Sequence, residues 1–325
     1  IVMAQAIAGV VAITVQYRRA IAPRLASLAL HYAVALVLLA TGALLGFLIA
    51  WSNAHGRSAL ADGFYLAHTT TMLLGFVGTT VLGTLTVLWP TMLRTPMEPV
   101  APRWTTRGLP YLVGGTALVA ACGLWPPLAG LGTLVYLGGA CAVLVPAYRT
   151  ARRVPPTSFA TASAAASVAW FIGCVAVLGA RMALADDAAA AREVIHSLRL
   201  PLAAGFALQI LVAALSYLTP VMLGGGPAAT RATNAIMDRF AAYRVTAANA
   251  CLLLALYPGA PWQVRVVAGA LAALVTSYLL AGMILSLREL SQRKRPPRTP
   301  RTPADADPTS DPAGHRPAQP RRGTR

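Results

Sequence analysis

Histidines inside apolar sequence are the residues of this chain best suited to chemistry. His68 opens the segment "HTTTMLLGFVGTTVLGTLTVLWPTML", in which hydroxyls and glycines interrupt apolar side chains. An imidazole in hydrocarbon costs free energy, so it usually faces the interior of a helix bundle, where it pairs, relays protons or binds a metal. We interpret His68 as a candidate metal ligand. A hydrogen bond to a neighbouring helix is the alternative.

Two further histidines are expected near the same face of the membrane. His55 lies in the loop before this segment, and His196 lies in "AREVIHSLRLP". The second stretch predicts a short interfacial helix before Pro201, whose Val194, Ile195 and Leu198 face lipid. The candidate metal ligands are therefore His55, His68 and His196, with a purely interfacial position as the alternative for the last.

The threonines beside His68 have a simpler explanation. Small residues recur every four positions and form a ridge that lets another helix backbone approach closely. The ridge comprises Ala67, Thr71, Gly75, Thr79 and Gly83. Helix packing accounts for this pattern without any ligand.

Composition determines which elements must position these residues. Hydrophobic residues make up 57% of the 325 positions and charged residues 11%, more apolar surface than a soluble domain can bury. Each span needs about 20 apolar residues, and only helices or closed barrels satisfy the backbone in lipid. We predict an all-α, polytopic transmembrane helical bundle with about nine spans. They are expected at 1–16, 27–51, 64–90, 109–124, 128–147, 159–183, 201–223, 243–257 and 264–287.

The first predicted span is short and begins abruptly, which we interpret as the remainder of a helix cut off upstream or as a start-site error. Residues 1–287 form the predicted membrane domain. The last 38 positions, 288–325, hold eight prolines with ten basic and four acidic residues, a composition typical of disorder. This tail is expected to lie against anionic lipid headgroups rather than to bind nucleic acid.

Arginine predicts the orientation, because cytoplasmic loops collect basic residues. Alternate loops, at 18–24, 94–107, 149–153 and 231–244, hold twelve arginines and two acidic residues. The other loops hold five arginines and four acidic residues. We therefore place residue 1 outside and the C-terminus in the cytoplasm.

Two segments of the chain resemble each other. When Gly75–Leu93 is set over Gly205–Leu223 without a gap, seven of nineteen positions are identical. Both segments run from outside to inside, and four spans separate their starts. A parallel repeat of four helices is the economical interpretation.

The runs "AHTTTMLLGFVGTTVLGTLTVLWPTMLRTPM" and "GFALQILVAALSYLTPVMLGGGPAATRA" resemble the membrane region of bacterial copper oxidase and nitrite reductase-like proteins. That region is similar to the NnrS family and, distantly, to the catalytic subunit of haem-copper oxidases. The resemblance covers about residues 10 to 287. It implies histidine-held haem or copper, a redox partner or cupredoxin-type protein, and a bacterial inner membrane. His68 matches the family's recurrent histidine, and His196 is offset by two residues.

Two functions follow from these observations. The first is a redox-linked membrane domain that binds haem or copper through His68 and His196, with His55 as a further metal ligand. The second is a non-enzymatic membrane scaffold or small-molecule transporter with a central pathway. That pathway would be lined by Thr79, Thr84, Gln209 and Asn249. No paired acid and base and no nucleophile constellation indicates catalysis by this chain alone.

Overall fold

The computed structural model describes residues 1–19 and 23–293, and all regular secondary structure in these ranges is helical. The all-α prediction is confirmed for this part of the chain. The elements are α1 (Val2–Arg19), α2 (Pro23–Ala54), α3 (Ser58–Thr70), η1 (Thr71–Gly78), α4 (Thr79–Met92), α5 (Ala101–Ala120), η2 (Ala121–Gly123), α6 (Pro127–Arg153), α7 (Phe159–Ala183), α8 (Ala188–Leu200), η3 (Pro201–Leu208), α9 (Gln209–Leu223), α10 (Gly226–Met237), α11 (Ala241–Leu256) and α12 (Trp262–Arg293).

Six helical segments of the described chain are long and apolar enough to cross a membrane. They are Leu28–Ala54, Ser58–Met92, Pro127–Arg153, Phe159–Ala183, Ala188–Leu223 and Trp262–Arg293. The chain is therefore an integral membrane protein. The three other predicted spans coincide with α1, α5 and α11, which are not among the six, so a total of nine spans remains a prediction.

The predicted end of the membrane domain at residue 287 falls inside α12, which continues to Arg293. Most of the tail predicted to be disordered, residues 294–325, lies outside the described residues.

The prediction of a separate interfacial helix before Pro201 is wrong. α8, η3 and α9 form one continuous helical segment, and Val194, Ile195 and Leu198 are buried rather than lipid-facing. They pack in a cluster with residues that include Leu66 and Met182. Proline lacks an N–H and crowds the preceding turn, but η3 begins at Pro201 and has the wider π-helical hydrogen-bond pattern, so the helix continues.

Backbone conformation repeats at the offset found in the sequence match. α3 and α8, η1 and η3, and the starts of α4 and α9 all differ by 130 positions, as Ser58 differs from Ala188. π-Helical segments are rare, so two at equivalent positions are informative. The residues that follow the two long segments also correspond: Arg94 has φ +53° and Gly224 has φ +64°.

The small-residue ridge packs as predicted. A Cβ on Gly75 would meet Leu38 of α2 at 3.1 Å, and one on Gly83 would meet His31 of α2 at 2.9 Å. Thr71 and Thr79 are buried along the same line.

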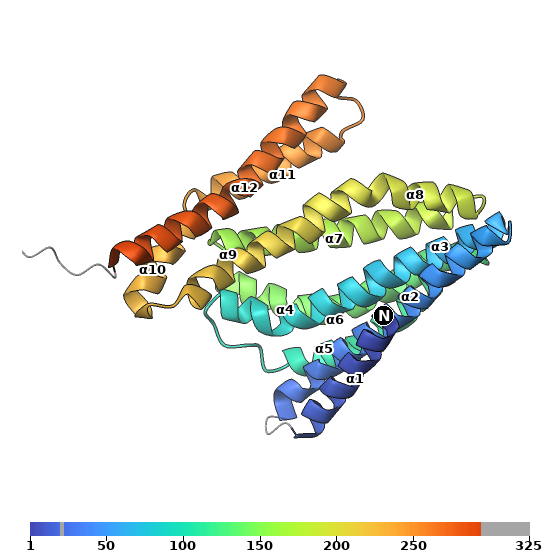
Figure 1. The fold of residues 1–325 in the computed structure, drawn as a ribbon, viewed down its shortest axis with the longest axis horizontal. Helices are drawn as coiled ribbons and strands as arrows, with labels where there is room; N and C mark the ends of the chain where they lie inside the picture. Colours follow the sequence, from blue (N-terminus) through green and yellow to red (C-terminus); the bar gives the residue numbers. More distant parts are fainter. Residues whose placement is uncertain (20–22, 294–325) are drawn as a thin grey trace, which may run out of the picture.

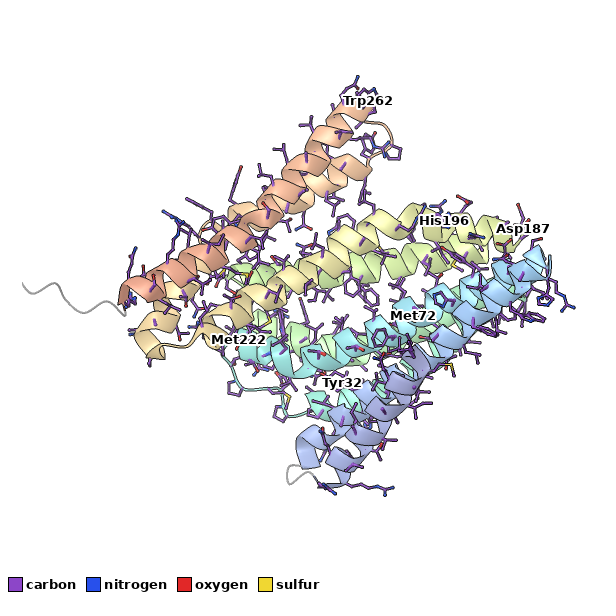
Figure 2. The ribbon with its side chains drawn as sticks, viewed as in Figure 1. Tyr32, Met72, Asp187, His196, Met222 and Trp262 are labelled. Atoms are coloured by element: carbon purple, nitrogen blue, oxygen red, sulfur yellow. The ribbon has the colours of Figure 1, made fainter. Side chains whose placement is uncertain are left out.

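The helices lie side by side in a tilted array (Figure 1). The largest cluster of buried side chains joins η1 and α4 to α5, α6, α7 and η3, and it includes Leu74, Leu112, Tyr136, Phe171 and Phe206. At one edge, α11 and α12 form a pair that diverges from α8 and α9 toward the end labelled Trp262 (Figures 1 and 2). This edge carries the groove described below.

Candidate functional site

His68 is held between two helices. It lies on α3, and its Nδ1 is 2.8 Å from the carbonyl oxygen of Gly42 on α2. A carbonyl only accepts hydrogen bonds, so Nδ1 carries the proton and Nε2 is the nitrogen left for another partner. A Cβ on Gly46 would lie 3.3 Å from the same ring, so α2 packs closely against the imidazole.

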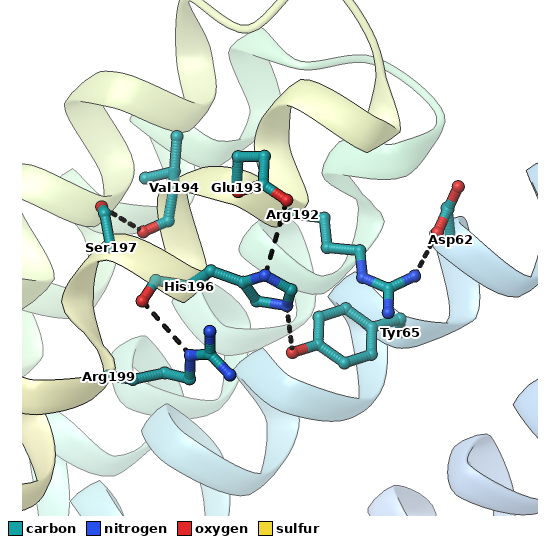
Figure 3. Close-up of polar contacts among 8 residues, drawn as sticks. All are labelled: Asp62, Tyr65, Arg192, Glu193, Val194, His196, Ser197 and Arg199. Atoms are coloured by element: carbon teal, nitrogen blue, oxygen red, sulfur yellow. Dashed lines mark hydrogen bonds and ion pairs between the residues drawn. The ribbon is translucent and has the colours of Figure 1, made fainter.

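His196 belongs to a polar cluster where α8 meets α3 (Figure 3). Its Nε2 is 3.2 Å from the Tyr65 hydroxyl, and its Nδ1 is 3.5 Å from Glu193. One turn away, Arg192 forms an ion pair with Asp62 at 2.7 Å and stacks on the Tyr65 ring. Asp62 and Arg192 occupy equivalent positions at the 130-residue offset, so the two like-oriented helices meet there through corresponding residues.

His55 has a different setting. It is exposed, its Nδ1 is 2.8 Å from the carbonyl oxygen of Trp51, and its ring lies 4.5 Å from the Trp51 ring. The helical stretch from Ser58 to His68 rises about 15 Å, so a single metal ion would not reach both His55 and His68.

Among residues 1–19 and 23–293, no group of three or more His, Cys, Asp or Glu side chains could hold a metal ion. Each predicted histidine has a different neighbour: His68 contacts Gly42, His196 contacts Tyr65, and His55 contacts Trp51. The assignment of a cofactor to His68 and His196 stays a prediction.

A groove of about 220 Å³ separates α11 and α12 from α7, η3 and α9. Its walls are mostly small or aliphatic side chains, with a few polar groups among them. The lining comprises Phe159, Ser163, Leu200, Ala204, Leu208, Gln209, Val212, Arg244, Val245, Ala248, Asn249, Leu252, Ala255, Gly269, Ala272, Ala273, Val275 and Thr276.

The polar groups of the groove differ in how they are satisfied. The Asn249 amide accepts from Trp170 Nε1 at 2.7 Å and donates to the Val245 carbonyl at 2.8 Å. The Gln209 amide and the Ser163 hydroxyl have no hydrogen-bond partner among the described residues. Gln209 is half-buried, so its amide is available to hydrogen-bond a ligand in the groove.

Arg244 closes one end of the groove. Its guanidinium lies between the rings of Phe159 and Tyr278, 3.6 and 4.1 Å from their centroids, and donates to the Met237 carbonyl at 2.8 Å. Its Nε has no partner in the part of the chain that the structure describes.

The structure corrects the interpretation of Arg244 as a loop residue. It lies inside α11 and is only 5% exposed. The signal available in the sequence was an arginine four residues inside an apolar stretch, a pattern that marks functional positions within membranes.

The predicted pathway residues divide into two pairs. Gln209 and Asn249 line the same groove. Thr79 and Thr84 do not: Thr79 is buried and its hydroxyl contacts the Leu74 carbonyl, whereas Thr84 shares a hydrogen bond with Tyr32 on α2.

No protein-family model, curated protein or solved structure matches this chain.

Proposed function

We propose that this integral membrane protein is non-enzymatic and binds a small amphiphile in the groove between α7, η3 and α9 on one side and α11 and α12 on the other. The observation that carries the proposal is the unpartnered Gln209 amide in an apolar groove. Ligand sites combine mostly apolar walls with a few polar groups that fix orientation, and this groove has that composition.

The dimensions of the groove suit a molecule with a chain and a head. From Arg244 to Ala255, α11 rises about 16 Å along the groove. A chain lying against Ala248 and Leu252 would place its head between Gln209 and Arg244. Arg244 only donates hydrogen bonds and Gln209 can donate through its amide nitrogen, so the head that we propose is an acceptor such as a carboxylate or carbonyl group.

The test is a binding titration of a fluorescent long-chain fatty acid with the purified full chain. We expect saturable binding that Gln209→Leu weakens at least tenfold. Gln263→Leu is the matched control, because Gln263 is exposed on α12 and does not line the groove. Equal binding by wild type and Gln209→Leu would contradict the proposal.

We propose further that the bundle is a parallel four-helix repeat, in which α2 to α6 correspond to α7 to α12. The shared offset of the helix boundaries, the two π-helical segments and the contact between Asp62 and Arg192 support this arrangement. In this proposal α1, α5 and α11 complete nine spans of a bacterial inner-membrane protein, and the C-terminus lies in the cytoplasm.

A redox-linked domain that binds haem or copper is the second candidate. The observation that favours it is the orientation of His68: an Nδ1–H held by a backbone carbonyl is the arrangement of many metal-bound histidines, in which Nε2 is the ligand. A bound haem or copper ion would supply electron transfer, and a redox partner would supply the electron.

Visible absorption of protein purified from haem-replete cells tests this candidate. A haem site predicts a Soret band and a copper site predicts bound copper in a metal analysis; His68→Ala should abolish either signal and His55→Ala should leave it intact. Colourless, metal-free protein would exclude it and leave the groove proposal unaffected.

A further inference from the structure

A second cavity lies at the ends of the helices, away from the groove. Its volume is about 320 Å³, and it is bounded by the C-terminal end of α4, the α6–α7 connection, α9 and α10. In contrast to the groove, many of its lining residues are polar. These include Arg94, Thr157, Ser158, Ser216, Asn234 and Asp238.

Opposite charges face this cavity without pairing. Arg94 follows α4, and Asp238 lies between α10 and α11. They are close enough to interact electrostatically, yet no ion pair within 4.0 Å joins them in the described chain. Asp238 Oδ1 accepts a hydrogen bond from the Phe159 backbone N–H at 2.9 Å, which fixes the carboxylate at the start of α7.

Ser216 adds a buried polar group to the same wall. The residue is 3% exposed, and its Oγ has no hydrogen-bond partner among residues 1–19 and 23–293. Asn234, which is half-buried, lines the same cavity. An unpaired buried hydroxyl costs free energy, and the residue that carries this one is part of the cavity wall.

The two signs of charge restrict the ligand. Asp238 would repel a simple anion, and Arg94, together with the nearby Arg244, would repel a simple cation. Arginine binds oxyanions through parallel N–H donors, and a carboxylate accepts from an ammonium group. We propose that this cavity binds a small zwitterion that carries an oxyanion and a primary amine, with the oxyanion at Arg94 and the amine at Asp238.

The backbone at Arg94 gives independent support. Its φ of +53° is in the left-handed region, which is unfavourable for a residue with a side chain. The equivalent position at the 130-residue offset is Gly224, with φ +64°. Strained residues cluster at functional sites, and Arg94 lines the cavity in a backbone conformation that glycine would adopt more readily.

The ligand chemistry has two sources, a free metabolite or the ethanolamine phosphate head of a phospholipid. The test uses the full chain in nanodiscs of pure phosphatidylglycerol and measures binding of phosphoethanolamine by calorimetry. We expect saturable binding that Arg94→Gly and Asp238→Asn each weaken at least tenfold. Arg94→Gly suits the left-handed backbone, and Asp238→Asn keeps the acceptor for Phe159, so both variants retain the local structure.

Arg152→Ala is the control, because Arg152 is an exposed arginine of a neighbouring basic segment that does not line the cavity. Nanodiscs that contain phosphatidylethanolamine separate the sources: competition by this lipid assigns the site to a lipid head, and unchanged binding assigns it to a free metabolite. Absence of saturable binding, or equal binding by wild type and Arg94→Gly, would overturn the proposal. Neither result depends on whether the groove binds an amphiphile.

Discussion

At the scale of residues, two charged side chains at the start of α7, the half-buried Asp238 and the buried Arg244, carry most of the information about function. Asp238 caps the Phe159 N–H, and Arg244 stacks on the Phe159 ring. Burial raises the pKa of the Asp238 carboxyl, while the Phe159 hydrogen bond, Arg94 and Arg244 act in the opposite direction. The charged form of Asp238 is therefore disfavoured by folding.

The raised pKa of Asp238 predicts that the stability of the protein depends on pH. A carboxyl whose pKa is raised in the folded state contributes stability below its unfolded pKa, about 3.9, and loses it as pH rises through the folded value. Asp238→Asn should therefore differ little from wild type in Tm near pH 3.5 and gain Tm relative to wild type at higher pH. Thermal unfolding across this range measures the difference, with exposed Asp186→Asn as control. A constant difference at all pH values would refute the assignment.

The sequence indicates the residue types but not their neighbours. The sequence predicts His68 as a metal ligand or as a ring hydrogen-bonded to a neighbouring helix, and its contact with the Gly42 carbonyl on α2 agrees with the second alternative. Arg244 was misassigned because a count of loop arginines does not show which of them fold back between aromatic rings. Partners distant in sequence, such as Phe159 and Tyr278, depend on tertiary packing that local pattern does not specify.

At the scale of elements, glycines determine how closely α5 and α6 approach. A Cβ on Gly115 would lie 2.5 Å from the Tyr136 backbone nitrogen, and one on Gly132 would lie 2.6 Å from the Val119 nitrogen. Gly114 and Gly138, on the same helices, have nothing within 4 Å of such a Cβ. The two helices therefore pack backbone to backbone at Gly115 and Gly132, as they do at Gly108 and Gly139, but not at Gly114 and Gly138.

Substitutions at these glycines should separate the two cases. Gly115→Ala and Gly132→Ala force the helices apart and should each cost about 1–3 kcal/mol of stability. Gly114→Ala and Gly138→Ala should be neutral or slightly stabilising, since alanine favours helix. Unfolding in a mild detergent measures the stability of all four variants. Equal losses of stability for the two variants of α5, or for the two variants of α6, would contradict this packing.

The contact of α3 with α8 makes a second prediction at this scale. Asp62→Arg alone places two cations together and should lower Tm, whereas the exchange Asp62→Arg with Arg192→Asp should restore most of the loss. Because both side chains are partly exposed, the ion pair itself contributes at most about 1 kcal/mol. Failure of the exchange to rescue the single variant would show that these helices do not meet through equivalent residues.

Hydropathy identified where most helices lie, but it did not show their continuity. The span expected at 159–183 coincides with α7, whereas the span expected at 201–223 begins thirteen residues earlier, at Ala188. Proline normally predicts a break. The π-helical turn that accommodates Pro201 is stabilised by packing against α7, which a single-sequence pattern does not reveal.

At the scale of the whole molecule, the proposed orientation predicts which loops are accessible from outside. In a chain whose four cysteines are replaced, Arg57→Cys should react with an impermeant maleimide in intact cells. Arg152→Cys should react only after the membrane is permeabilised. Both arginines are exposed in the structure, so differences in labelling report the side of the membrane, and the reverse pattern would invert the topology.

The divergence of α11 and α12 from α8 and α9 gives the molecule its groove, and the occupancy of this groove is the central claim (Figure 1). Ala272 lines the groove from α12, whereas Ala270 is exposed on the same helix and does not line it. A phenylalanine at position 272 would fill the groove, whereas a phenylalanine at position 270 would leave the groove open.

The most direct measurement is native mass spectrometry of the full chain extracted from its membrane. Wild type and Ala270→Phe should retain one tightly bound amphiphile, and Ala272→Phe should lose it while remaining folded. Wild-type protein that carries no amphiphile, or Ala272→Phe that retains it, would contradict the account.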